Sequence, residues 1–183
     1  MNKIYTLLCM VMVYGGFAQS NNVIQDNLGQ VTFFSYTSVE NIEAVNNTVQ
    51  TAIDLSNEVI VVSMLMRTFE FKKALMQEHF NESYVESDLY PTLTFKGKIE
   101  GIGDIGSGDS RTTLVSGDMT FHGVEKKVEV KTKIENKEGK YTLSGGFEIN
   151  IDDYEIKVPG LLAPNIAKTI EITFRFEYES NEQ

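Results

Sequence analysis

The chain has little of what disulfide-linked or metal-centred proteins depend on. Its 183 residues include one cysteine, two histidines, three prolines and no tryptophan. The single cysteine, Cys9, lies in the first apolar segment, so the rest of the chain has no disulfide framework. A hydrophobic core must therefore stabilise the fold by itself, and a chain of this length suits one domain.

Positive charge is also scarce. The sequence has 16 Lys and Arg residues against 26 Asp and Glu residues, a formal net charge of −10 that is spread along the chain. An acidic surface repels polyphosphate backbones and anionic membrane faces. We therefore expect no nucleic-acid partner and no electrostatic docking on a membrane.

The first residues have the pattern of a secretory signal peptide. Lys3 is the only charge before the apolar segment 4–14, and small Gly16 and Ala18 precede a cleavage position. The apolar segment is too short to span a bilayer, so we expect no stable membrane insertion. The alternative is a buried N-terminal strand. We expect residues 1–18 to be removed on export and residues 19–183 to form the mature domain.

Catalytic and metal-binding patterns are missing as well. The two histidines, His79 and His122, lie far apart in the sequence, and neither neighbours a second ligand at zinc spacing. His79 falls in an apolar helical row, so we expect a packed, hydrogen-bonded side chain. His122 occupies a hairpin corner, where we expect its ring to bond to the backbone. We therefore expect no enzyme, no cofactor and no metal site, with a hydrolase or isomerase inside the fold as the weaker alternative.

What the sequence does have is alternation of apolar and polar residues. The clearest strand ends near residue 178 and places on one face Ile166, Ile170, Ile172, Phe174, Phe176 and Tyr178. Turn signals at 101–110, 122–123 and 136–139 separate the strands of the second half. Strands joined by short turns pair antiparallel.

The first half predicts further strands and one helix. The strands are 29–38, 42–44, 48–55 and 58–66, with breaks at Asn46-Asn47 and Ser56-Asn57. Residues 60–66 are apolar at both parities, so we expect both faces of that strand to be covered. Residues 71–80 repeat apolar residues at near-helical spacing, and we expect this short helix to pack on the outside of that strand.

Eight or nine antiparallel strands with one short helical insert can avoid exposed edges as a closed barrel or as a sandwich. An eight-stranded barrel has an interior that side chains fill or that holds one apolar ligand. Composition alone favours the packed interior, because protein cores are close-packed. Flexible methionines and aromatic rings would suit a ligand-binding lumen instead.

Two segments carry a resemblance to a known family. Residues 89–97 (LYPTLTFKG) and 117–128 (GDMTFHGVEKKV) resemble the K-Y-P-T-I-T-F strand and the G-x-L-T-L-H-G-V-T-K hairpin of the YceI-like family, in the same order. Residues 78–87 take the place of the helical stretch that precedes the Tyr-Pro strand in that family. Residues 147–155 lack the arginine and the glycine of the family pattern. If that arginine seats an anionic head group of the ligand in the family, its absence implies that this protein prefers a different head group or none.

The resemblance implies an all-β fold, an antiparallel lipocalin-like barrel of about eight strands with one short helical insert at 71–84 that partly closes it. It implies a bacterial protein, periplasmic or secreted, whose lumen binds a polyisoprenoid or another long-chain apolar lipid. The predicted ligand contacts are Met64, Met66, Leu75, Phe80, Phe95, Met119, Phe121, Phe147 and Phe174. The alternative function is a ligand-free interaction module of the cell envelope with a fully packed barrel, and a homodimer stays open.

Overall fold

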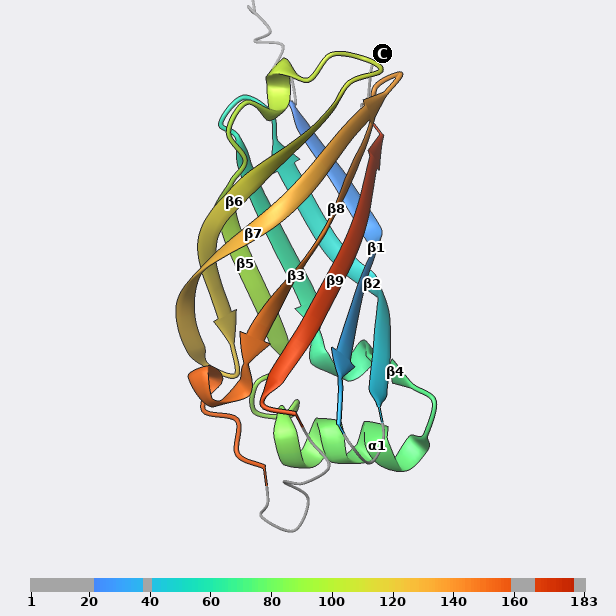
Figure 1. The fold of residues 1–183 in the computed structure, drawn as a ribbon, viewed down its shortest axis with the longest axis vertical. Coiled ribbons are helices and arrows are strands. Elements are labelled where there is room, and N and C mark those ends of the chain that lie inside the picture. Colours follow the sequence, from blue (N-terminus) through green and yellow to red (C-terminus); the bar gives the residue numbers. More distant parts are fainter. Residues whose placement is uncertain (1–21, 38–40, 159–166, 180–183) are drawn as a thin grey trace, which may run out of the picture.

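Eight long strands form a closed antiparallel barrel in the computed structural model, which describes residues 22–37, 41–158 and 167–179 (Figure 1). The neighbours around the barrel are β1, β9, β8, β7, β6, β5, β3 and β2, and β2 pairs back with β1. The strands are β1 Val23–Ser35, β2 Ile42–Asp54, β3 Val59–Leu65, β5 Thr92–Lys98, β6 Ser110–Phe121, β7 Val124–Lys137, β8 Lys140–Asn150 and β9 Thr169–Glu179. The predicted antiparallel barrel is confirmed, whereas the predicted signal peptide and Ile166 lie outside the described residues.

Short helices lie at the two ends of the barrel. The α-helix α1, Ala74–His79, continues into a π-helical turn, Phe80–Tyr84, and lies across one end, which we call the α1 end (Figure 1). The two-residue strand β4, Glu70–Phe71, pairs with β2 just before α1, so the helix starts later than the predicted residue 71. Three 3₁₀ turns complete the elements, η1 Met66–Thr68, η3 Ile102–Asp104 and η4 Ile151–Tyr154.

The prediction that β3 is covered on both faces is wrong. Ile60, Val62 and Met64 point into the barrel and are buried, but Val61 and Leu65 on the other face are 42% and 49% exposed. The helix does not cover them, because α1 lies across the end of the barrel rather than along its side (Figure 1). The strand therefore has one buried and one solvated face, as antiparallel sheets commonly do.

The predicted break at Asn46-Asn47 is also wrong, because β2 continues through it. Asn46 is fully buried, and its side-chain amide donates to the carbonyl of Leu65 at 3.2 Å. Its Oδ1 accepts from the backbone N–H and the hydroxyl of Thr48 at 2.9 and 3.0 Å. These bonds satisfy a polar side chain inside a strand, and a shift in the β1–β2 register beside Gly29 accommodates it.

The end of the barrel opposite α1, the far end, is filled by a tightly packed cluster that we call the far-end plug. Each side chain of the plug has almost no exposed surface, and its members are Ile53, Ile99, Ile102, Ile134, Leu143 and Tyr178. The hydroxyl of Tyr178 makes a hydrogen bond with that of Thr51, and burial raises the pKa of Tyr178. The plug therefore closes this end of the interior.

Two glycines allow β5 and β6 to approach closely beside the interior. Gly97 and Gly117 are directly opposite each other in the strand register. A Cβ atom on Gly117 would meet the carbonyl oxygen of Lys96, and would lie 2.5 Å from the Gly97 Cα and 2.7 Å from the Phe95 ring. The ring of Phe95 occupies the space that side chains at both glycines would otherwise fill.

Candidate functional site

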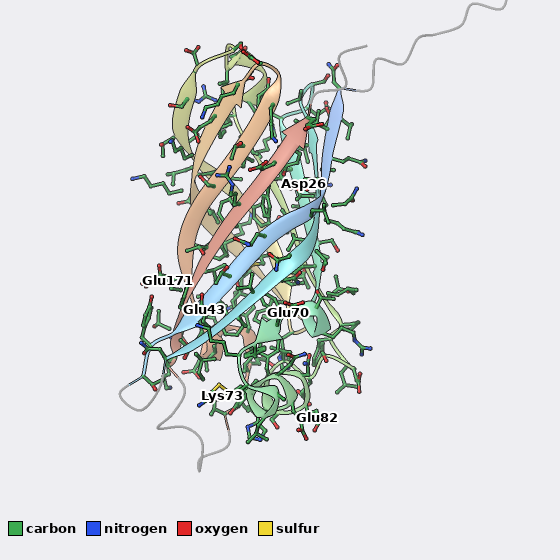
Figure 2. The ribbon with its side chains drawn as sticks, turned by 90° about the vertical axis from the view of Figure 1, so that its right-hand side faces the viewer. Asp26, Glu43, Glu70, Lys73, Glu82 and Glu171 are labelled. Carbon is green, nitrogen blue, oxygen red and sulfur yellow. The ribbon has the colours of Figure 1, made fainter. Side chains whose placement is uncertain are left out.

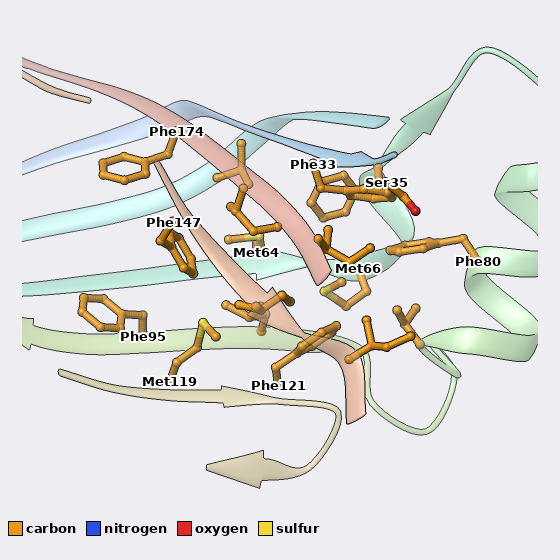
Figure 3. Close-up of a pocket in the computed structure, with 18 of the residues that line it drawn as sticks. Phe33, Ser35, Met64, Met66, Phe80, Phe95, Met119, Phe121, Phe147 and Phe174 are labelled. Carbon is orange, nitrogen blue, oxygen red and sulfur yellow. The ribbon is translucent and has the colours of Figure 1, made fainter. Parts of the chain in front are cut away.

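A cavity of about 440 Å³ lies between the far-end plug and α1 (Figure 3). Its volume falls within the range of small-molecule sites, roughly 300–1,000 Å³. Strands on every side of the barrel contribute inward-facing side chains to its wall, and most of these are aliphatic, methionine or phenylalanine. The interior of this barrel is therefore not fully packed, and the space inside it is apolar.

All nine residues predicted to contact a ligand line this cavity. Met64, Met66, Phe80, Met119 and Phe121 are buried. The rings of Phe95, Phe147 and Phe174 come from β5, β8 and β9 and point into the barrel, and all three are half-buried (Figure 3).

Leu75 differs from the other eight. It lines the cavity from α1, yet it is 61% exposed, so it lies at the rim where the cavity approaches solvent. The structure thus brings the nine residues around one space, and their contact with a ligand stays a prediction.

An aromatic cluster narrows the α1 end of the cavity. Phe80 packs against Phe33, Phe69 and Phe71, with ring centroids 5.4, 5.7 and 5.0 Å apart. Such distances are those of favourable edge-to-face and offset pairs. The cluster joins β1, the end of η1 and β4 to the helical segment, and it therefore fixes the helix across the barrel end.

Sequence reasoning missed most of this cluster. Phe33 could have been found, because Val31, Phe33 and Ser35 alternate within the predicted strand 29–38 and all three line the cavity. Phe69 follows a 3₁₀ turn, where neither a period of two nor a helical period applies, so no pattern marks it.

Polar side chains in the cavity wall gather at the α1 end. Four of the five lie there, namely Ser35 at the end of β1, Lys73 just before α1, His79 at its last turn and Tyr84 in the π-helical turn, and the fifth, Thr132 on β7, lies deeper. The hydroxyl of Ser35 accepts a hydrogen bond from the backbone N–H of Ala167 at 3.1 Å. Partial burial raises the pKa of the Tyr84 phenol. We call these four residues the polar rim.

His79 is not the hydrogen-bonded core residue that the sequence predicts. It is half-buried, it lines the cavity, and its ring has no hydrogen-bond partner within the described part of the chain. The helical row was identified correctly, but the row faces a cavity rather than a packed wall. His79 therefore belongs to the polar rim.

His122 connects three segments at the α1 end without lining the cavity. It is buried in the turn between β6 and β7, where its φ of 51° and the φ of 76° at Gly123 indicate a type I′ turn. Its Nδ1 lies 3.0 Å from the carbonyl oxygen of Tyr154, and its Nε2 lies 3.1 Å from a carboxylate oxygen of Glu86. The ring also packs against Tyr90, with centroids 4.3 Å apart. The predicted bond to the backbone is confirmed.

The described residues also bear on metal binding and on membrane-spanning helices. Over residues 22–37, 41–158 and 167–179, His, Cys, Asp and Glu side chains form no group of three or more that could hold a metal ion. Within the same ranges, no helix combines the length and the apolar character needed to cross a membrane.

Comparison with known proteins gives a family and a set of similar folds. A family model described as YceI-like domain matches residues 22–178. No curated protein matches the sequence significantly.

Three solved structures share the fold at low identity. A polyisoprenoid binding domain from Saccharophagus degradans, implicated in plant cell wall breakdown, is 12% identical with a TM-score of 0.77, and the match covers 87% of this chain and 98% of that one. BcnA from Burkholderia cenocepacia is 16% identical with a TM-score of 0.67, covering 81% and 95%. A YceI protein from Campylobacter jejuni is 15% identical with a TM-score of 0.62, covering 80% and 90%.

Proposed function

The chain belongs to the YceI-like domain family, and from that premise we propose that it binds a long-chain apolar molecule, a polyisoprenoid or another lipid, inside the barrel. The observation that carries this proposal is the apolar cavity of about 440 Å³ enclosed by the strands. The similarity of fold to a polyisoprenoid binding domain supports the choice of ligand class. Sequestration or transport of that molecule is the role that follows.

The affinity would come from removing the ligand tail from water. Burial of apolar surface contributes roughly 25 cal/mol per Å². The methionine side chains in the wall, Met64, Met66, Met76 and Met119, can adjust to an irregular tail because they are unbranched and flexible. Tight binding therefore needs no charged contact with the tail.

Purified protein is expected to carry its lipid. An organic extract of protein purified from its native host, analysed by mass spectrometry, should contain a long-chain molecule in near-stoichiometric amount. An extract of an unrelated protein purified in the same way is the control. If no lipid co-purifies and the protein also fails to take up added long-chain alcohols, the ligand-free interaction module becomes the better account.

We also propose that the protein acts outside the cytoplasm, in the periplasm or after secretion. Lys3, the apolar segment 4–14 and the small residues Gly16 and Ala18 support export with cleavage after Ala18. N-terminal sequencing of the protein from the native host is expected to begin at Gln19. A mature chain that still begins at Met1 would contradict this expectation.

Binding rather than catalysis fits the chemistry of the wall. The polar rim offers a hydroxyl, an ammonium group, an imidazole and a phenol, but the wall has no carboxylate, and no cysteine stands among its residues. The homodimer stays a prediction that the oligomeric state of the purified protein will decide.

A further inference from the structure

We propose that the cavity is a blind tube that takes one apolar tail, end first through the α1 end, and accepts about fifteen carbon atoms of it. This inference rests on the proposed function and narrows its ligand class. A polyisoprenoid of many units would leave most of its length outside the barrel. Three features of the cavity support it, namely a closed far end, polar groups gathered at the α1 end and a small volume.

The far end of the cavity is closed by packed side chains. Its last wall residues include Phe176, Val115, Val130 and Leu143, and the plug residues Ile134 and Tyr178 lie beyond them with no exposed surface. The ring of Phe176 stacks on that of Phe174, with centroids 5.1 Å apart, and rests against Gly29, where an added Cβ would lie 2.7 Å from it. The hydrogen bond between Tyr178 and Thr51 joins β9 to β2 behind this wall. A tail that reaches this wall cannot continue through it.

The direction of insertion follows from where the polar groups lie. Ser35, Lys73, His79 and Tyr84 all belong to the α1 end, and Lys73 lies beside α1 on the outside of the barrel (Figure 2). The one polar wall residue deeper in, Thr132, donates its hydroxyl to the carbonyl of Val130 at 3.3 Å. A buried polar head group at the far end would therefore lack partners, which is costly. The head group belongs at the polar rim and the tail at the plug.

The surroundings of the rim disfavour a highly charged anionic head group. Glu43, Glu70, Glu82 and Glu171 all lie in the half of the molecule nearer α1 (Figure 2). The pair of Lys72 and Glu43, 2.9 Å apart, cancels one of these charges, and the other three carboxylates outnumber the Lys73 ammonium of the rim. An excess of acidic side chains repels anions. A neutral alcohol is therefore a suitable probe for the tube.

The capacity follows from volume and depth. At roughly 30 Å³ for each water-sized heavy atom, a cavity of 440 Å³ holds about fifteen of them. Ile170 and Phe176 line the cavity near its two ends on β9. With a rise of about 3.3 Å per residue and a strand tilt of about 40°, that segment spans about 15 Å along the barrel axis. Carbon atoms beyond this depth stay in water and add no burial.

A chain-length series tests the capacity. Primary alcohols with straight chains of 8 to 22 carbons are titrated against N-phenyl-1-naphthylamine bound to the mature protein, and displacement gives each affinity. Affinity should increase about fourfold for each added carbon up to about fifteen, and then stop increasing. An affinity that continues to increase through the longest alcohol would overturn the blind tube while leaving lipid binding intact. Failure of the dye and of every alcohol to bind would overturn the proposed function itself.

Variants at the far end test what sets the limit. Phe176→Ala removes a ring from the closed end, so the chain length at which affinity stops increasing should move up by several carbons. Val115→Phe adds a ring at the closed end, so the chain length at which affinity stops increasing should become shorter. This variant tests the closed end even if Phe176→Ala fails to fold. The matched control is Leu114→Ala, which removes a side chain that is 58% exposed on the outer face of the same strand and should leave the limit in place. An unmoved limit in both folded far-end variants would overturn the assignment of the closed end.

Discussion

Met119→Asp is expected to abolish ligand binding and to destabilise the barrel by several kcal/mol. Met119 is buried on β6 opposite Phe95 and points into the cavity (Figure 3). A carboxylate there has no cationic or hydrogen-bonding partner once an apolar tail fills the space, so either the ligand leaves or the acid stays protonated at a cost. Dye displacement measures the loss of binding, and urea unfolding measures the loss of stability.

Leu114→Asp is the matched control for this charge. Leu114 lies on the same strand, faces outward and is 58% exposed. A carboxylate at that position stays hydrated, so the free energy of unfolding should change by no more than about 0.5 kcal/mol and binding should persist. If Met119→Asp binds the dye as well as Leu114→Asp does, Met119 does not face the ligand.

A milder substitution at the same residue separates binding from stability. Met119→Trp keeps the wall apolar and reduces the volume of the cavity, so the longest alcohol that binds should become shorter without unfolding of the protein, provided that the indole N–H finds a partner. An unchanged chain-length series in the folded variant would show that the tail does not pass Met119.

Gly117→Ala is expected to destabilise the protein by about 3 kcal/mol or more, although it adds one methyl group. The new Cβ would meet the backbone of β5 at the Lys96 carbonyl and lie 2.5 Å from the Gly97 Cα. Neither group can move without separating β5 from β6, and the Phe95 ring blocks movement toward the cavity. The methyl group is therefore accommodated only by distortion of the barrel wall.

Gly103→Ala provides the comparison for this substitution. Gly103 lies in η3, and its added Cβ would have only the Leu55 carbonyl oxygen nearby, at an ordinary 3.5 Å. Its free energy of unfolding in urea should stay close to that of the wild type. Equal losses from the two substitutions would show that the close approach of β5 and β6 does not determine the cost.

The sequence predicts the strands well where one periodicity dominates. In β9 the apolar residues alternate without interruption, and in β8 only Gly145 breaks the alternation, so the inward face and the place of Phe147 and Phe174 in it follow from a period of two. The same rule fails for β3, where Val61 and Leu65 are apolar but exposed. Hydrophobicity does not exclude a residue from the surface, so apolar residues at both parities do not imply that both faces are covered.

The presence of a cavity could not be predicted from composition. It depends on which rings face one another across the barrel and on how closely neighbouring strands approach. The ring of Phe95 fits against Gly97 and Gly117 because both lack a side chain, and this arrangement appears only once the strand register is known. Phe69 and Asn46 were missed for a related reason, because their positions depend on a turn and on a register shift rather than on a repeating pattern.

Closure of the sheet limits how another chain could recognise this protein. Each long strand among the described residues has a hydrogen-bonded neighbour on both sides. The pairing of β1 with β9 ends at Gln30. Beyond it, the carboxylate of Asp26 (Figure 2) accepts a hydrogen bond from the backbone N–H of Glu177 at 2.8 Å, so this N–H is not left free as it would be on an open strand edge. Recruitment of a foreign strand by edge-to-edge pairing, which is a route to aggregation, therefore finds little backbone available. A protein partner would therefore have to recognise side chains rather than unpaired backbone.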